Sequence, residues 1–248
     1  MLDYQAPNDL LKEKVILVTG AGDGIGKQAA LTYAAHGATV ILLGRTTKKL
    51  EEVYDQFESL GFPQGAIVPL NLDTAVEHDY IELANTIESE FGRLDGILHN
   101  ASLLGDRTPL ANYEPSTFEQ VMRVNVNAAF LLNQALIPLL QKAPSASIIF
   151  TTSSVGRKAK AYWGAYAVSK FATEAMMQLL ADELENISQI RVNAINPGAT
   201  RTNMRAFAYP AEDPNTLKTP KDIMPLYLYL MGNDSADVNG ESLDAQPK

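Results

Sequence analysis

Residues 15–26 read Val-Ile-Leu-Val-Thr-Gly-Ala-Gly-Asp-Gly-Ile-Gly, an apolar run that ends in a glycine-rich turn. A segment with helical periodicity follows, so this stretch predicts a buried strand, a phosphate-binding loop and the start of a helix. We expect Gly20 to permit the tight turn, Gly24 to admit backbone N–H groups close to a pyrophosphate, and Gly26 to let the helix pack closely on the strand. Tight corners also occur without a ligand, so this motif alone leaves a purely structural turn open.

The bulk composition indicates an ordinary globular domain. The chain has 248 residues, 46% of them apolar, which suits one large α/β domain with a full core. Its formal net charge is −9 and no basic run stands out, so nucleic acid and anionic membranes are not expected as partners. No apolar stretch is long enough to span a bilayer. Residues 1–8 lack the apolar segment of a secretory signal, and we therefore expect a cytoplasmic protein.

The inventory of side chains limits the chemistry further. The sequence contains no cysteine, which excludes disulfides, thiol catalysis and thiolate metal sites. Its three histidines, His36, His78 and His99, lack the spacing of metal ligands, so no metal site is expected.

Apolar runs alternate with longer amphipathic segments along the whole chain, which is typical of βαβ units and a parallel sheet. Strands are predicted at residues 14–19, 39–43, 66–70, 94–98, 146–151, 190–195 and 241–243. Helices are predicted at residues 24–36, 46–60, 75–91, 116–141, 163–187 and 220–231. Right-handed crossovers then give an α/β, doubly wound Rossmann fold, with a seven-stranded parallel sheet in the order 3-2-1-4-5-6-7 and helices on both faces.

No linker or internal repeat divides the chain, so residues 1–248 are predicted to form a single domain. Residues 1–12 are its N-terminal extension, and residues 203–219, rich in Pro, Ala and Asp, are a mobile substrate-binding loop with short helical pieces. The ligand crevice is expected at the carboxyl ends of the first and fourth strands, where the strand order reverses.

Three side chains are candidates for chemistry in that crevice. Tyr166 and Lys170 are four residues apart on a predicted helix, so they share a face, and the ammonium would lower the pKa of the phenol. Ser153 follows the predicted strand 146–151, where its hydroxyl could polarise a substrate carbonyl. The plainer alternatives are a solvated helix face anchored by a tyrosine and a Ser/Thr-rich turn that caps a strand.

The sequence resembles the short-chain dehydrogenase/reductase family over about residues 10–245. The resemblance rests on the TGxxxGxG turn at 19–26, the strand-end Ser153, the YxxxK pair thirteen residues later and Asn-Pro-Gly at 196–198. Within the family, the segments DLL…ILVTGAGDGIG, SSVGRKAKAYWGAYAVSKFATEAMMQ and PLYLYLMG…DAQP are most similar to the bacterial YciK-type oxidoreductases.

The resemblance implies a role for each matching residue. Tyr166 would be the general acid, Lys170 would lower its pKa and hold the nicotinamide ribose, and Ser153 would bind the substrate carbonyl. Asn125 matches the asparagine that perturbs the long helix and holds a water next to the lysine, and Asn127 is its neighbouring alternative. The implied cofactor contacts are Gly20, Asp23, Gly24, Ile25, Gly26, Arg45, Asn71, Leu72, Asn100, Ala101, Tyr166, Lys170, Pro197, Gly198 and Thr202.

Two positions depart from the family pattern. Ser102 replaces a glycine in the turn 99–102, so that turn is expected to be tighter or rearranged. Asn71 stands where an aspartate usually meets the adenine, and its amide can still accept and donate hydrogen bonds there.

The end of the second predicted strand favours NADP(H) over NAD(H). An acid there would bind the ribose 2′-hydroxyl, whereas this chain has Arg45, which can hold a 2′-phosphate with paired hydrogen bonds. Lys48 and Lys49 follow closely. Asp23 in the glycine turn is the counter-evidence, and an ordinary surface charge at a helix start is the alternative for Arg45.

These observations predict an NADP(H)-dependent oxidoreductase that transfers hydride between the nicotinamide and a carbonyl or alcohol substrate. The alternative is a nucleotide-binding redox sensor or scaffold with little turnover. An epimerase of nucleotide sugars is disfavoured, because only about 46 residues follow Thr202.

The substrate pocket and the subunit contacts are predicted in outline. Leu103, Leu104, Tyr162, Trp163 and the loop 203–219 should line the pocket, with Met204 and Phe207 touching substrate, while Trp163 could instead pack a subunit contact. The family forms homodimers or homotetramers through its two long helices, and the predicted outer face of helix 163–187 carries Phe171, Met177 and Leu184.

Overall fold

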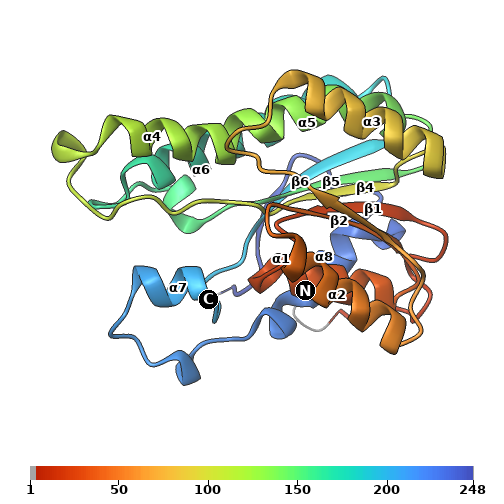
Figure 1. Ribbon diagram of the computed structural model, residues 1–248, viewed down its shortest axis with the longest axis horizontal. Helices are drawn as coiled ribbons and strands as arrows, with labels where there is room; N and C mark the ends of the chain where they lie inside the picture. The colour runs from red at the N-terminus through yellow and green to blue at the C-terminus, as the bar shows by residue number, and fades with distance from the viewer. Residues whose placement is uncertain (1–3, 248) are drawn as a thin grey trace.

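Seven parallel strands form one sheet in the order β3-β2-β1-β4-β5-β6-β7 in the computed structural model, which describes residues 4–247 (Figure 1). The strands are β1 (Val15–Thr19), β2 (Thr39–Gly44), β3 (Ala66–Pro69), β4 (Gly96–His99), β5 (Ala146–Thr151), β6 (Ile190–Asn196) and β7 (Ser242–Asp244). The predicted fold class and strand order are confirmed. Residues 1–3 of the predicted N-terminal extension, and residue 248, lie outside the described residues.

Helices cover both faces of the sheet (Figure 1). They are α1 (Gly24–Ala35), α2 (Thr47–Ser59), α3 (Glu77–Phe91), α4 (Pro115–Met122), α5 (Ala128–Leu140), α6 (Gly164–Glu185), α7 (Asn203–Ala208) and α8 (Met224–Met231). Side chains from α1, α2 and α8 fill the core on one face, and side chains from α3, α5 and α6 fill it on the other. The central strands are buried on both sides, which explains why they are continuous apolar runs in the sequence.

The loops after β1 and β4 meet where the strand order reverses. The Thr19 hydroxyl at the end of β1 accepts hydrogen bonds from the backbone N–H groups of Asn100 and Ala101, at 2.9 and 3.0 Å. This contact joins the glycine turn to the loop that follows β4. The crevice therefore opens at the carboxyl ends of these strands, as expected for a doubly wound sheet.

The predicted helix at 116–141 is observed as continuous helix over residues 115–140, with a π-helical turn where the resemblance implied that Asn125 perturbs it. A π-helical segment, η2 (Arg123–Asn127), separates α4 from α5. Such an inserted turn shifts the side chains that follow it around the helix axis and is often found at functional sites. Apolar residues recur with helical period on both sides, so the periodicity did not reveal the interruption.

The predicted outer face of α6 also needs correction. Met177 and Leu184 are buried in the core, whereas Phe171 is 43% exposed. Phe171 and Met177 are six residues apart, which places them about 120° apart around a helix. The outward stripe of α6 is instead Val168, Phe171 and Leu179. Among residues 4–247 no helix combines the length and the apolarity needed to cross a membrane.

Candidate active site

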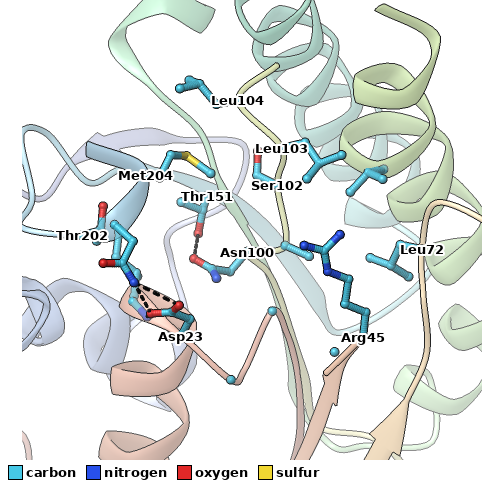
Figure 2. A pocket seen from close by; sticks show the side chains of 18 of the residues that line it. Asp23, Arg45, Leu72, Asn100, Ser102, Leu103, Leu104, Thr151, Thr202 and Met204 are labelled. Atoms are coloured by element: carbon cyan, nitrogen blue, oxygen red, sulfur yellow. Dashed lines mark hydrogen bonds between the residues drawn. The ribbon is translucent and has the colours of Figure 1, made fainter. Parts of the chain in front are cut away.

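A cavity of about 440 Å³ at the carboxyl ends of the strands brings most of the predicted site residues together (Figure 2). It is lined by Gly20, Asp23, Gly24, Ile25, Arg45, Asn71, Leu72, Asn100, Ala101, Ser153, Tyr166, Lys170, Pro197, Gly198 and Thr202. Gly26 and Asn125 do not line this cavity. They contact residues that do, because Gly26 packs against the backbone of Gly20 and Asn125 forms hydrogen bonds with the backbone of Leu103. Residues spread over more than 180 positions of the sequence thus share one site.

The glycine turn has the close packing that its sequence predicts. Gly20 has a φ of +67°, and a Cβ there would lie 3.0 Å from the Cα of Ala101. A Cβ at Gly26 would collide with the backbone oxygen of Gly20. The turn leads into α1, where the Asp23 carboxylate accepts a hydrogen bond from the Gly24 N–H at 2.7 Å. A larger residue at Gly20 or Gly26 would therefore push the turn and the β4 loop apart.

Asp23 links three segments of the site. Its carboxylate pairs with the Lys49 ammonium of α2 at 2.6 Å and accepts a hydrogen bond from the Asn203 amide of α7 at 3.2 Å. The hydrogen bond from Lys49 is the main reason why the pKa of Asp23 is lowered. The negative charge that argued against NADP(H) is thus matched by a neighbouring positive charge.

Arg45 follows β2, whereas Ser153, the hydrogen-bond partner of Tyr166, follows β5, and β1 and β4 lie between these strands, so Arg45 and Tyr166 lie at opposite ends of the cavity. Figure 2 shows its side chain extending from the end of β2 into the space between Asn100 and Leu72. Within residues 4–247, no carboxylate lies within 4.0 Å of its guanidinium. Asn71 is exposed, and its side-chain oxygen accepts a hydrogen bond from the Asp73 N–H. An unpaired guanidinium at this place fits a phosphate group.

Tyr166 and Lys170 lie on one face of α6, at the inner end of the cavity. Both are buried, and the Lys170 Nζ lies 5.4 Å from the centroid of the Tyr166 ring. Burial raises the pKa of Tyr166 to about 12, against a smaller opposing effect of the Ser153 hydroxyl. Burial also lowers the pKa of Lys170 to about 8. The phenol is therefore protonated at neutral pH, and the predicted lowering of its pKa by Lys170 is not among the causes that act here.

The Lys170 ammonium has hydrogen-bonding capacity left over. It donates to the backbone oxygen of Thr151 at 2.7 Å, and no other acceptor within residues 4–247 takes a hydrogen bond from it. An ammonium has three donors. The remaining N–H groups lie beside the cavity, so the site fits a ligand with hydroxyl groups, such as the ribose of a nicotinamide cofactor.

Asn125 is placed by the π-helical segment. Its side-chain amide exchanges two hydrogen bonds with the backbone of Leu103, at 2.7 and 2.9 Å, and donates a third to Ser169 at 3.0 Å. Asn127, the alternative at the sequence level, is exposed. Behind the main cavity lies a small void of about 10 Å³, lined by both Asn125 and Lys170, which is close to the space that one water molecule needs.

A buried carboxylate beneath Lys170 was not predicted from the sequence. Glu174 lies one turn further along α6, is 6% exposed, and counteracts the lowering of the Lys170 pKa. It accepts hydrogen bonds from Ser242 at 2.8 Å and from Arg157 at 3.3 Å. Its spacing of four residues from Lys170 was the available signal.

The substrate end of the cavity is apolar and aromatic. Leu103, Leu104, Trp163, Met204 and Ala208 line it. Two predictions were wrong here, because Tyr162 and Phe207 are 55% and 72% exposed and line no part of it. Ala208, four residues after Met204, faces the cavity in place of Phe207.

The Ser102 side chain lines the cavity, and its buried hydroxyl has no hydrogen-bond partner within the described part of the chain. Over residues 4–247 no group of three or more His, Asp or Glu side chains is arranged to hold a metal ion.

Comparisons with known proteins agree with this geometry. The profile of the short chain dehydrogenase family matches residues 14–213. The oxidoreductase YciK of Escherichia coli (strain K12) is 55% identical over 246 residues, which cover 99% of this chain and 97% of the relative. This chain therefore belongs to the short chain dehydrogenase family of oxidoreductases and is of the YciK type.

Two solved structures match over nearly the whole chain. A short chain dehydrogenase from Escherichia coli CFT073, complexed with NADPH, is 56% identical with a TM-score of 0.94 and covers 98% of this chain and 100% of its own. Its counterpart from Shigella flexneri 2a str. 301, complexed with NADP, is 55% identical with a TM-score of 0.94 and covers 97% and 100%.

Proposed function

We propose that this protein is an NADP(H)-dependent oxidoreductase that reduces a carbonyl compound to an alcohol. The observation that carries the proposal is one cavity with Arg45 and the glycine turn at one end and Ser153, Tyr166 and Lys170 at the other. The NADPH and NADP complexes of two relatives support the choice of cofactor.

Each side chain has a defined part in the reaction. Bound NADPH supplies a hydride to the carbonyl carbon. Ser153 donates a hydrogen bond to the carbonyl oxygen, and Tyr166 gives that oxygen its phenolic proton as the alcohol forms. The raised pKa of Tyr166, about 12, suits this direction, because the phenol holds its proton at neutral pH. The apolar walls formed by Leu104, Trp163 and Met204 exclude water from the reacting carbonyl.

Lys170 acts through its charge and its free N–H groups. Its ammonium binds the ribose hydroxyls of the cofactor with the N–H groups that Thr151 leaves free. Asn125 holds the π-helical segment against Leu103, and the small void beside Lys170 provides room for a water molecule that returns a proton to the site.

The pH dependence of reduction should report Lys170. With a pKa of about 8, Lys170 is mostly protonated at neutral pH and loses its positive charge as the pH rises through about 8. Tyr166 stays protonated over this range. We expect kcat/KM for the carbonyl compound, measured with saturating NADPH, to be constant near neutral pH and to fall above about pH 8. In Glu174→Gln the fall should move to lower pH, because Glu174 raises the pKa of Lys170. An unchanged profile in that variant would show that another group titrates.

The direct test is the oxidation of NADPH with a panel of aldehydes, ketones, diketones and quinones, with NADH in parallel. Turnover with NADPH and little with NADH is the expected result. The alternative, a nucleotide-binding sensor or scaffold, predicts tight binding of the cofactor without turnover on the whole panel. We propose that the reaction takes place in the cytoplasm, where most of the NADP(H) pool is in the reduced form, NADPH.

We also propose that the protein forms a homodimer or homotetramer through α5 and α6. Phe130 on α5 is 53% exposed, and Val168, Phe171 and Leu179 form an outward apolar stripe on α6. Large apolar side chains in a stripe of this kind are unusual for a helix that faces water.

Phe171→Glu is expected to convert the oligomer to a monomer, because a carboxylate buried in an apolar contact lacks a partner. Light scattering at micromolar concentration measures the change. Phe207→Ser is the matched control, since Phe207 is 72% exposed on α7, away from α5 and α6. A monomeric wild-type protein would contradict the proposal.

A further inference from the structure

Arg107 lies in the segment after β4 and is stacked on two aromatic rings beside the substrate end of the cavity. Its guanidinium carbon is 4.4 Å from the centroid of Trp163 and 5.0 Å from that of Tyr209. Its Nη1 donates a hydrogen bond to the backbone oxygen of Ala208 at 2.7 Å. Arg107 itself is exposed and does not line the cavity, whereas Trp163 and Ala208 do, so this cation lies behind these two residues at the rim of the substrate end.

The charge of Arg107 is not matched by a carboxylate. Nearby Arg205 also stacks on Tyr209, with its guanidinium carbon 3.9 Å from the ring centroid, but it forms a bidentate ion pair with Glu212. Arg107 differs, because no Asp or Glu of residues 4–247 lies within 4.0 Å of its guanidinium. A guanidinium has five N–H donors, and Ala208 takes only one hydrogen bond. A stacked guanidinium is also held in place before a ligand arrives, which lowers the entropic cost of binding.

The position relative to Tyr166 limits the size of the ligand. The centroids of Trp163 and Tyr166 are 5.6 Å apart, and Arg107 is 4.4 Å from Trp163. The guanidinium carbon therefore lies no more than 10.0 Å from the Tyr166 ring. A small or medium-sized molecule with its carbonyl group at Tyr166 can thus place an anionic group at Arg107 if its apolar chain runs along Trp163 to the rim of the cavity.

We propose that Arg107 binds the carboxylate of the substrate, so that the protein reduces oxo acids in preference to neutral carbonyl compounds. This inference rests on the reductase activity proposed above. A carboxylate matches the planar fork of the guanidinium and carries the single negative charge that one unpaired arginine balances. The apolar surface of Trp163, between Tyr166 and Arg107, fits the carbon chain that separates the carbonyl group of such a substrate from its carboxylate.

The test compares the semialdehydes of succinate and adipate with their methyl esters as substrates for NADPH oxidation. The wild-type protein is expected to have at least about a tenfold higher kcat/KM for an acid than for its ester, since a hydrogen bond to a charged group contributes about 1.5–3 kcal/mol. Arg107→Met should remove this preference, mainly through a higher KM for the acid, and should leave the ester within about twofold. Arg107→Lys should keep part of the preference, because it retains the charge without the fork.

Lys160→Met is the control for a loss of positive charge in the same region. Equal losses in Lys160→Met and Arg107→Met would show general attraction of anions and would overturn the assignment to Arg107. A similar loss on acids and esters in Arg107→Met would show that Arg107 only clamps α7 through Ala208. Equal kcat/KM for acids and esters in the wild-type protein would likewise overturn the inference while leaving the reductase function in place.

A second measurement does not depend on turnover. Trp163 is the single tryptophan of the chain, so its fluorescence reports on the Arg107 stack. Titration with succinate or adipate should give a saturable change in the wild-type protein and none in Arg107→Met, and the dimethyl esters should have no effect. If no compound of the carbonyl panel oxidises NADPH, the reductase proposal fails, and this titration still decides whether Arg107 binds a carboxylate.

Discussion

Tyr166→Phe should lower kcat for carbonyl reduction by at least about 100-fold and leave NADPH binding within about threefold of the wild-type value. The phenolic hydroxyl is the proton donor in the proposed reaction, and phenylalanine lacks it. The ring itself packs with Leu104, Val155 and Ala167, and Phe preserves those contacts. The change therefore removes the proton without opening a cavity in the fold.

The comparison needs both kinetics and binding. Turnover is followed by NADPH oxidation with the best carbonyl substrate, and NADPH affinity is measured by fluorescence titration. Tyr162→Phe is the matched control, because Tyr162 is 55% exposed and lines no part of the cavity. Full turnover of Tyr166→Phe would mean that another group protonates the alcohol and that the proposed mechanism is wrong.

Arg45→Met is expected to reduce kcat/KM for NADPH by about 10- to 100-fold and to leave kcat/KM for NADH within about threefold. The reason is that the two cofactors differ in the 2′-phosphate, and Arg45 is the unpaired guanidinium at that end of the cavity. The measurement is the ratio of the two kcat/KM values at constant ionic strength, since salt weakens such contacts.

Arg45→Lys separates charge from geometry, because lysine keeps the positive charge but loses the fork. An intermediate preference for NADPH is expected. Equal losses with NADPH and NADH in Arg45→Met would contradict a role for Arg45 in choosing the cofactor. They would instead support the alternative that Arg45 is a surface charge at the start of α2.

Asp23 shows how a local sequence argument can mislead about charge. An acid in the glycine turn is unfavourable for a second phosphate when considered alone. In the structure its carboxylate is paired with Lys49 at 2.6 Å, a residue 26 positions later. Both side chains are about half exposed, so the pair mainly balances charge and adds little stability.

Helical spacing predicted a shared face correctly for residues four apart and wrongly for Phe171 and Met177, which are six apart. Tyr166 and Lys170 lie together as their spacing indicated. Phe171, Met177 and Leu184 were expected on one outer face, yet two of the three are in the core. The π-helical segment around Asn125 was implied by the family resemblance and not by periodicity, because a single inserted turn leaves the apolar pattern on each side intact.

The sequence by itself determined the strands, the sheet order and the glycine turn, which follow from apolar runs, helical period, glycine geometry and the handedness of crossovers. The full set of residues at the carboxyl ends of the strands followed from the resemblance to the family. Only the tertiary structure decided the protonation of the site and its charge balance. Burial raises the pKa of Tyr166, and Lys49 forms an ion pair with Asp23. Arg107 stacks on Trp163 and Tyr209 and has no carboxylate partner among the described residues. Desolvation and Coulomb interactions depend on which distant segments meet in space, and local sequence patterns do not contain that information.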